Sequence, residues 1–473
     1  MADLKYEFGM IGIGTMGRNL VLNMSDHGYS VAAIDRNQEQ VDILKKENEG
    51  RNVFATTDPH EFINALKIPR SIIMLVPAGK IVDAVIDEYK SLLTDGDLLM
   101  DWGNSHYTDT NTRIEQLEKL NIHFMGVGIS GGESGARHGP SIMPGGPKDI
   151  FERVAPMLQS ISAKVGNDAC TAWLGPGSAG HYVKMVHNGI EYGLMQLISE
   201  CYHLLKEILG LNNDELHKVF SQWNEGRLHS FLLEITADIF LQQDHLTDHR
   251  LIDMILDSAH QKGTGGWTSE DAMELQVPIP VIDIAVSMRN LSAYKKDRIL
   301  AQQKLNNTKT KLSVNKAEFL TALEEAFYFS MITTYAQGMA LLHSASVAYH
   351  YELNLETIAR IWRGGCIIRA SMLEDIRTAY SDQPDLSNIM LNDSIGEKLM
   401  ESQDAIRKII HIGIDAGIPI AALMSSLNYF DGYRSGWLPA NLIQAQRDLF
   451  GAHTYERNDR EGTFHTIWNH KEE

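Results

Sequence analysis

The sequence predicts an α/β domain built on a doubly wound parallel sheet, then a large all-helical domain, then a C-terminal tail. Over residues 1–178, short apolar strands alternate with amphipathic helices, as in a parallel sheet with helices on both faces. Over residues 179–440 the strand pattern stops and helix follows helix. Residues 441–473 are rich in aromatic, histidine and arginine side chains and lack the apolar periodicity of a core.

Length and composition set the broad class of protein. A chain of 473 residues is too long for one ordinary core, so two or three domains are expected. The formal net charge of −19 argues against nucleic acid and anionic membranes as partners, because both require a basic surface. The three cysteines are widely spaced and no apolar signal or spanning segment is seen, so we expect a cytoplasmic protein without a zinc site.

A glycine-rich turn follows the first expected strand, which covers residues 8–13. The turn, residues 12–17, reads G-x-G-x-x-G and precedes an amphipathic helix at 18–27 and a second strand at 30–34. Asp35 ends that strand about 20 positions after the turn, which is the context of a dinucleotide-binding site rather than of a simple turn. The glycines let the backbone approach a pyrophosphate at the helix N-terminus. We therefore expect a Rossmann-type domain with cofactor contacts from Gly12, Ile13, Gly14, Thr15, Met16, Gly17, Asp35, Arg36 and Asn37.

The alternation continues through strands expected at 71–76, 98–101 and 123–129, with helices at 80–93 and 110–120. In doubly wound sheets, ligands bind outside the carboxyl ends of the strands. Residues at or just past these ends are therefore further candidates for the site: Val76, Pro77, Ala78, Asn104 and Ser130.

Two more glycine-rich stretches suit anions. Residues 128–146 contain seven glycines, and exposed N–H groups in such a stretch can hold a carboxylate or phosphate, unless it is a floppy surface loop. Residues 261–268 read Q-K-G-T-G-G-W-T and place Lys262 beside the hydroxyl of Thr264, with Arg289 on the following helix. Taken singly, these side chains are more simply explained as solvated.

One expected helix carries a row of polar residues. Residues 181–192 read H-Y-V-K-M-V-H-N-G-I-E-Y, with no proline and with apolar residues at helical spacing. Lysine and glutamate on one face could serve as base and acid if burial tuned them, while the histidine, asparagine and tyrosine could orient a polyhydroxylated substrate. Taken alone, a solvated face with Lys–Glu pairing is the simpler interpretation. Spacings of three and four residues put five side chains on that face: Lys184, His187, Asn188, Glu191 and Tyr192.

Longer motifs carry a resemblance to the 6-phosphogluconate dehydrogenase family over nearly the whole chain. They are I-S-G-G-E-S-G-A-R-H-G-P-S-I-M-P-G-G, H-Y-V-K-M-V-H-N-G-I-E-Y-G-L-M-Q, Q-K-G-T-G-G-W-T, W-R-G-G-C-I-I-R-A and L-P-A-N-L-I-Q-A-Q-R-D-L-F-G-A-H-T-Y. The resemblance implies oxidative decarboxylation of 6-phosphogluconate to ribulose 5-phosphate and CO2, with reduction of NADP and without a metal, in the pentose phosphate pathway.

The resemblance also implies roles for single residues. Lys184 takes the place of the base at the C3 hydroxyl, and Glu191 that of the acid that protonates C1 of the enediol. His187 and Asn188 stand with them at the sugar acid. The family is a homodimer with exchanged C-terminal tails, so two substrate contacts would come from the partner subunit, Arg447 and His453. The full substrate-binding set implied is Asn104, Ser130, Gly131, Gly132, Tyr192, Lys262, Thr264, Arg289, Arg447 and His453.

Three positions depart from the family pattern, all on the cofactor side: Asp35 where asparagine is common, Pro77 where lysine is, and Trp102 where glycine is. The Asp35 carboxylate favours the ribose hydroxyls of NAD, whereas Arg36 can pair with the 2′-phosphate of NADP. We expect NADP, and Asp35 leaves NAD open. The alternatives are a non-decarboxylating dehydrogenase of the hydroxyisobutyrate type and a catalytically silent dinucleotide-binding scaffold.

Overall fold

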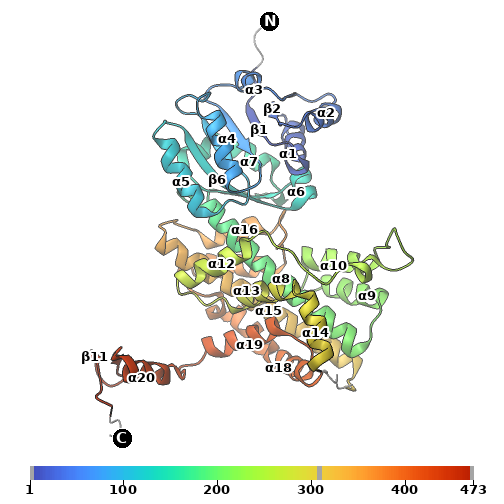
Figure 1. The fold of residues 1–473 in the computed structure, drawn as a ribbon, viewed down its shortest axis with the longest axis vertical. Coiled ribbons are helices and arrows are strands. Elements are labelled where there is room, and N and C mark those ends of the chain that lie inside the picture. The colour runs from blue at the N-terminus through green and yellow to red at the C-terminus, as the bar shows by residue number, and fades with distance from the viewer. Residues whose placement is uncertain (1–4, 306–311, 469–473) are drawn as a thin grey trace. The chain divides into compact units, whose positions relative to one another are not determined.

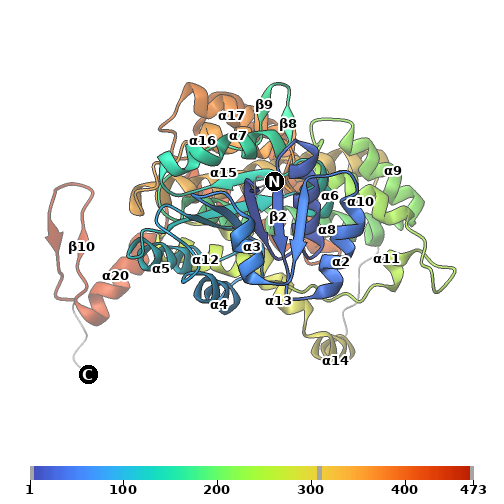
Figure 2. The same cartoon turned by 90° about the horizontal axis from the view of Figure 1, so that it is seen from above.

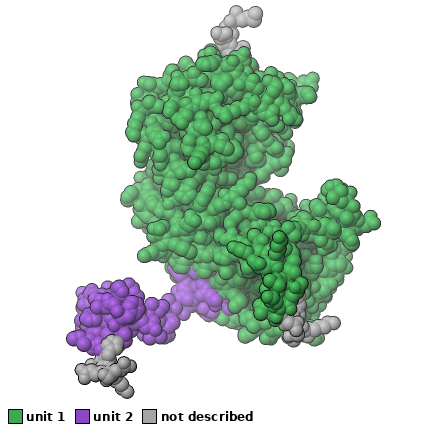
Figure 3. Space-filling model, viewed as in Figure 1, with its two compact units in different colours: residues 1–426 green, residues 427–473 purple. Residues whose placement is uncertain are grey.

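The computed structural model describes residues 5–305 and 312–468 (Figure 1). The outermost parts of the predicted first and last domains, residues 1–4 and 469–473, and residues 306–311 lie outside the described residues. Contacts divide the chain into two compact units, residues 1–426 and residues 427–473 (Figure 3). The boundaries expected at residues 178 and 440 remain predictions.

A seven-stranded sheet forms the first half of unit 1, in the order β3-β2-β1-β4-β5-β6-β7. The chain winds outward from the centre in both directions, which confirms the doubly wound sheet. Strands β1 to β6 are parallel, as predicted, whereas β7, a strand that the sequence analysis did not identify, pairs antiparallel with β6. The strands are β1 (Phe8–Ile11), β2 (Val31–Ile34), β3 (Val53–Thr56), β4 (Ser71–Met74), β5 (Leu98–Asp101), β6 (His123–Ser130) and β7 (Ser141–Pro144).

Helices cover both faces of this sheet (Figures 1 and 2). Successive side chains of a strand point to opposite faces, so Met10 and Ile73 enter one apolar cluster while Ile11 and Ile72 enter the other. Each fully buried side chain of this kind contributes about 1.5–3 kcal/mol of transfer free energy. The first cluster includes side chains of α1 (Thr15–Asp26), α2 (Gln38–Glu47) and α7 (Lys148–Ile161), and the second those of α3 (Pro59–Ala65), α4 (Lys80–Tyr89) and α5 (Tyr107–Glu118).

The glycine-rich stretch 128–146 is ordered secondary structure rather than a loop. It contains the end of β6, the short helix α6 (Gly132–His138) and all of β7. The three glycines at 131, 132 and 139 have positive φ, where L side chains are strained, so they supply the sharp turns around α6. The buried Ala136 anchors α6 in the sheet cluster, which explains a helix that its glycine content does not predict.

Helix α8 (Ala179–Leu209) joins the sheet to the helical half of unit 1. A Cβ on Gly180 would lie 2.3 Å from the carbonyl oxygens of Gly126 and Met143, so the start of α8 sits directly on β6 and β7. Further along, a Cβ on Gly338 would lie 2.4 Å from Ile190, so α8 packs closely against the long helix α15 (Lys316–Ala348). This contact places the predicted polar row of α8 between the sheet and the helical bundle.

The remaining elements of unit 1 are helices, as predicted for the chain after residue 179. The exception is the small hairpin of β8 (Lys164–Val165) and β9 (Asp168–Ala169), which precedes α8. No helix among the described residues is long and apolar enough to cross a membrane. The helices are α9 (Asn213–Asn224), α10 (Phe231–Leu241), α11 (Leu251–Met254), α12 (Thr264–Glu274), α13 (Pro280–Ser292), α14 (Lys295–Leu305), α16 (Leu355–Trp362), α17 (Met372–Asp382), η1 (Ile389–Leu391), α18 (Asp393–Asp415) and α19 (Ala421–Tyr433), which ends in unit 2.

Unit 2 contains α20 (Ala440–Gly451) and the short hairpin β10 (Tyr455–Glu456) and β11 (Thr463–Phe464). The buried residue of α20 is a carboxylate, Asp448, which accepts from the indole of Trp468 at 2.9 Å and from the ring of His465 at 2.8 Å. Burial raises the pKa of Asp448, but these donors outweigh it and hold that pKa at about 2. The contacts of Asp448 therefore tie α20 to residues 465–468 of the same unit.

Candidate active site

The glycine turn after β1 fits a dinucleotide. Gly12 has φ +88°, and a Cβ there would lie 2.5 Å from the carbonyl oxygen of Leu75. A Cβ on Gly17 would lie 2.0 Å from the carbonyl oxygen of Gly12, so both positions require glycine. Gly14 instead faces open space at the start of α1, whose first turn has no acidic residue. The N-terminus of α1 is thus open to a phosphate.

A pocket of about 350 Å³ lies beside this turn, at the carboxyl ends of β1, β2 and β4. The carboxylate of Asp35 accepts the N–H of Ile13 at 2.9 Å and the N–H of Asn37 at 2.9 Å. Both its oxygens are therefore engaged by backbone. Asn37 is exposed, and its side chain caps α2. The predicted cofactor residues that line the pocket are Gly12, Gly14, Asp35, Arg36, Val76 and Pro77.

A larger cleft of about 850 Å³ joins the turn to the polar row of α8. It brings the predicted cofactor and substrate residues to one place, across the boundary between the sheet and the helical half. Residues that were not among the predicted site residues also line it, among them His106, Trp267 and Ile367. The predicted residues in the cleft are Gly14, Thr15, Met16, Gly17, Val76, Pro77, Ala78, Asn104, Ser130, Gly131, Gly132, Lys184 and Lys262.

Four members of the polar row of α8 are buried and Glu191 is partly buried, so the row is not a solvated helix face. Lys184 is 6% exposed, and its Nζ lies 3.4 Å from Nδ1 of His187. A Cβ on Gly128 would lie 2.4 Å from the Cβ of Lys184, so this glycine makes room for the lysine against β6. Glu191, one turn beyond His187, approaches Nδ1 of the ring at 3.9 Å.

Hydrogen bonds fix the orientation of His187. The N–H of Ile367 donates to Oγ of Ser130 at 3.2 Å, which leaves the Ser130 hydroxyl hydrogen for Nε2 of His187, also at 3.2 Å. Nδ1 then carries the ring hydrogen and donates to Oδ1 of Asn188 at 3.1 Å. The edge of Trp362 packs on the ring. The imidazole is thereby positioned between the end of β6 and the lysine.

The electrostatics of the row have the directions that acid–base chemistry requires. Burial lowers the pKa of Lys184, against the opposing charge of Glu191. Burial and then the lysine charge lower the pKa of His187 well below its usual value, so the ring is neutral. Burial raises the pKa of Glu191, against the charges of Lys184 and Arg289. The lysine can therefore lose its proton, and the glutamate can keep one, closer to neutral pH than in water.

A second cluster of predicted residues surrounds the N-terminus of α12. The Arg289 guanidinium lies 3.6 Å from the ring centre of the buried Tyr192. A Cβ on Gly265 would lie 2.4 Å from the same ring, so the first turn of α12 packs directly on it. Thr264 opens that helix, and the exposed Lys262 precedes it. Cations and a helix N-terminus thus converge, as a phosphate requires.

The two predicted residues of the tail, Arg447 and His453, lie in unit 2. Arg447, on α20, donates to Oε1 of Gln444 at 3.2 Å. His453 follows the helix, and its ring packs against Phe450.

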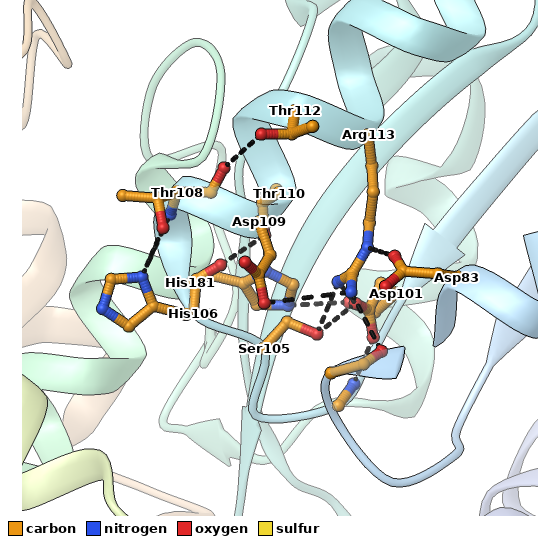
Figure 4. Close-up of polar contacts among 12 residues, drawn as sticks. Asp83, Asp101, Ser105, His106, Thr108, Asp109, Thr110, Thr112, Arg113 and His181 are labelled. Carbon is orange, nitrogen blue, oxygen red and sulfur yellow. Dashed lines mark hydrogen bonds and ion pairs between the residues drawn. The ribbon is translucent and has the colours of Figure 1, made fainter. Parts of the chain in front are cut away.

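A buried network supports the cofactor side of the cleft (Figure 4). The Arg113 guanidinium donates to the Asp83 carboxylate at 2.7 Å, to Oγ of Ser105 at 3.0 Å and to the Gly79 carbonyl at 3.1 Å. Arg113 therefore ties the loop after β4 to the loop after β5. His181, on α8, contacts the Asp101 carbonyl oxygen through Nε2 at 3.0 Å. The loops that carry Pro77 and Asn104 are thus fixed to the helix that carries Lys184.

A Rossmann-type domain whose cleft leads to a buried lysine and histidine and a partly buried glutamate defines a dinucleotide-dependent dehydrogenase. Two family models match along the chain: the NAD binding domain of 6-phosphogluconate dehydrogenase at residues 7–175, and the 6-phosphogluconate dehydrogenase C-terminal domain at residues 180–468. The chain belongs to the 6-phosphogluconate dehydrogenase family. The resemblance in its motifs is thereby confirmed.

Characterised relatives match at full length. The NADP(+)-dependent, decarboxylating 6-phosphogluconate dehydrogenase of Bacillus subtilis is 49% identical over 98% of this chain and 99% of its own. The decarboxylating enzyme of Synechococcus elongatus is also 49% identical, with the same coverage. A solved structure of the Plasmodium falciparum enzyme, studied with its cofactor NADP+ and its substrate 6-phosphogluconate, has a TM-score of 0.94 at 42% identity and covers 98% of this chain and all of its own.

Proposed function

We propose that this chain oxidises and decarboxylates 6-phospho-D-gluconate to D-ribulose 5-phosphate and CO2, with NADP as the oxidant. The observation that carries the proposal is that Lys184, on the polar row of α8, is buried and lines the same cleft as the glycine turn. The Bacillus subtilis relative is NADP-dependent and decarboxylating, and the Plasmodium falciparum relative takes NADP+ and 6-phosphogluconate. Full-length similarity to these enzymes favours this activity over the hydroxyisobutyrate type and over a silent scaffold.

When bound, NADP supplies the oxidised nicotinamide that accepts a hydride from C3 of the sugar acid. Lys184, with its pKa lowered by burial, takes the proton of the C3 hydroxyl and so favours a carbonyl at C3. Loss of CO2 from the resulting 3-keto acid leaves an enediol, and Lys184 returns its proton to the C3 oxygen. Glu191, with its pKa raised by burial, delivers a proton to C1 of the enediol while Lys184 takes back the proton of the former C3 hydroxyl, which becomes the C2 carbonyl of ribulose 5-phosphate. The row thus supplies one base and one acid.

The neighbours of the row hold the substrate. His187 is neutral and held by Ser130, so it offers a hydrogen bond without competing for the proton of Lys184. Asn188 offers an amide beside it. Gly131 and Gly132 have φ of +123° and +62° and line the cleft, so their backbone N–H groups suit the carboxylate. We place the 6-phosphate on Tyr192, Lys262, Thr264 and Arg289.

We further propose a homodimer in which each tail enters the partner's site and supplies Arg447 and His453. Two observations support this. Unit 2 exposes large apolar side chains, including Trp437 at 68%, Phe450 at 71% and Ile467 at 89%, and a surface of this kind usually has a partner. The chain as a whole carries −19 charges, so an anionic substrate needs cations gathered locally. A cytoplasmic location is also our proposal, supported by three buried free thiols.

Comparing 6-phosphogluconate with unphosphorylated gluconate tests the function and the phosphate cluster together. NADPH formation should be rapid with the phosphorylated acid, and kcat/KM should fall by at least about 10³-fold with gluconate, since charge-assisted contacts to the phosphate are lost. Equal rates with both substrates would contradict the assignment of the phosphate site. No NADPH with either would contradict the function.

A further inference from the structure

We infer that Glu88, on α4, determines how strongly this protein discriminates between NADP and NAD. It does so by pairing with Arg36 across the mouth of the pocket beside the glycine turn. The inference rests on the proposed function, because it takes this pocket to hold the adenosine half of the cofactor. The acidic end of β2 in a Rossmann-type domain faces that half.

Glu88 and Arg36 are 52 positions apart in sequence and meet in an ion pair. Both line the pocket, Arg36 with a side chain 79% exposed and Glu88 with one 32% exposed. Donating to Glu88 raises the pKa of the Arg36 guanidinium. Among the charged residues lining the pocket, Arg36 is the cation, and it faces two carboxylates, those of Glu88 and Asp35.

The carboxylates of Asp35 and Glu88 have different roles. Asp35 is fixed by the backbone N–H groups of Ile13 and Asn37, so it belongs to the architecture of the turn, and those dipoles offset its charge. Glu88 instead pairs with the Arg36 guanidinium, which is the group that would bind the 2′-phosphate of NADP. It is therefore the carboxylate that can change cofactor preference without disturbing the turn.

Glu88 should weaken the binding of NADP and leave the binding of NAD nearly unchanged. The 2′-phosphate of NADP must displace Glu88 from Arg36 and then remain near an uncompensated carboxylate. An exposed ion pair is worth up to about fivefold in an equilibrium constant, and the phosphate repulsion adds to it. NAD carries neutral hydroxyls at this position, so Glu88 costs it little. Glu88 thus lowers NADP preference in a chain that already lacks a lysine at Pro77.

The test is Glu88→Gln, with Asp87→Asn as the matched control. Asp87 is the preceding residue on the same helix, is 68% exposed and pairs with Lys90, so its variant removes one negative charge that is not paired with Arg36. The full-length protein is titrated calorimetrically with adenosine 2′,5′-bisphosphate and with 5′-AMP, which differ in the 2′-phosphate and need no turnover. The kcat/KM values for NADP and NAD are measured alongside.

We expect Glu88→Gln to bind the bisphosphate about three- to tenfold more tightly, with 5′-AMP changed less than about twofold. The NADP-to-NAD ratio of kcat/KM should rise by the same factor, and Asp87→Asn should change neither. Weaker bisphosphate binding would mean that Glu88 holds Arg36 in place for the phosphate and would overturn the inference, as would equal gains in both variants. Because the fragments report on the pocket without substrate, failure of the inference is distinguishable from failure of the proposed reaction.

Discussion

Nζ of Lys184 lies 3.4 Å from Nδ1 of His187, one turn further along α8, and both side chains are buried. Burial lowers both pKa values, and the lysine charge lowers that of the histidine further. A protonated ring this close would repel a protonated lysine, so His187 stays neutral. Burial thus makes it easier for Lys184 to lose its proton than in water, as its proposed role as a base requires, while the neutral ring of His187 can still bind a hydroxyl.

Lys184→Met should abolish NADP reduction and leave 6-phosphogluconate binding largely intact. The expected loss in kcat is about 10²–10⁴-fold or more, the usual contribution of a general base. Lys206→Met is the matched control, because Lys206 lies on the same helix but is 44% exposed and paired with Asp253. Near wild-type kcat in Lys184→Met would remove this lysine from the mechanism.

Glu191→Gln should slow the step after hydride transfer. The amide keeps the size of the side chain but has no proton to deliver, so protonation at C1 of the enediol loses its acid. Solvent deuterium should exchange into C1 of ribulose 5-phosphate at least about tenfold more slowly than in the wild type. Exchange measured by NMR at an unchanged rate would assign the acid to another residue.

Mixing two inactive chains tests the exchanged tail. In a dimer of Lys184→Met with Arg447→Ala, one site would combine the native lysine of one chain with the native arginine of the other. Random mixing makes half the dimers mixed, each with one intact site, so roughly a quarter of wild-type activity should return. If mixed dimers are verified by mass and remain inactive, each tail serves its own subunit.

Glu200 should make stability depend on pH. Its carboxylate is buried and accepts the N–H groups of Ala422 and Leu423, at the start of α19, at 2.8 and 3.0 Å. Burial outweighs these donors and raises its pKa to about 7. Between these two pKa values the folded state holds a proton that the unfolded chain has lost. The contribution of Glu200 to the free energy of unfolding is therefore fully present below about pH 4.5 and is lost as pH rises through 7.

Relative to the wild type, Glu200→Gln should gain stability between pH 5 and pH 8, by at most about 3 kcal/mol. Tm or denaturant midpoints measured across this range give the difference. Glu115→Gln, at an exposed position of α5, controls for the loss of one charge. A difference between Glu200→Gln and the wild type that stays constant with pH would show that Glu200 is ionised throughout.

The sequence predicts those parts of the site that depend on short-range spacing. The glycine turn is recognisable because strand, turn and helix follow one another within 20 residues, and the row of α8 because helical spacing aligns Lys184 with Glu191. Burial of that row depends on Gly128, 56 positions away, against which the lysine packs. Spacing alone therefore left a solvated face as the simpler interpretation.

Contacts between distant segments account for what the sequence does not predict. Asp35 has the position of a ribose ligand, but its oxygens bind backbone N–H groups that only the folded turn presents. Strand β7 reverses direction because α6, in a glycine-rich stretch, returns the chain beside β6. The pairing of Glu88 with Arg36 likewise requires α4 to pack beside the end of β2.

We propose that one cleft carries out both oxidation and decarboxylation. The most direct measurement uses 6-phosphogluconate labelled with ¹³C at C1 and follows NADPH and labelled CO2 together, in the wild type and in Lys184→Met. We expect one labelled CO2 for each NADPH in the wild type, and neither product in the variant. NADPH without labelled CO2 would contradict it, because the chain would then be a dehydrogenase that does not decarboxylate.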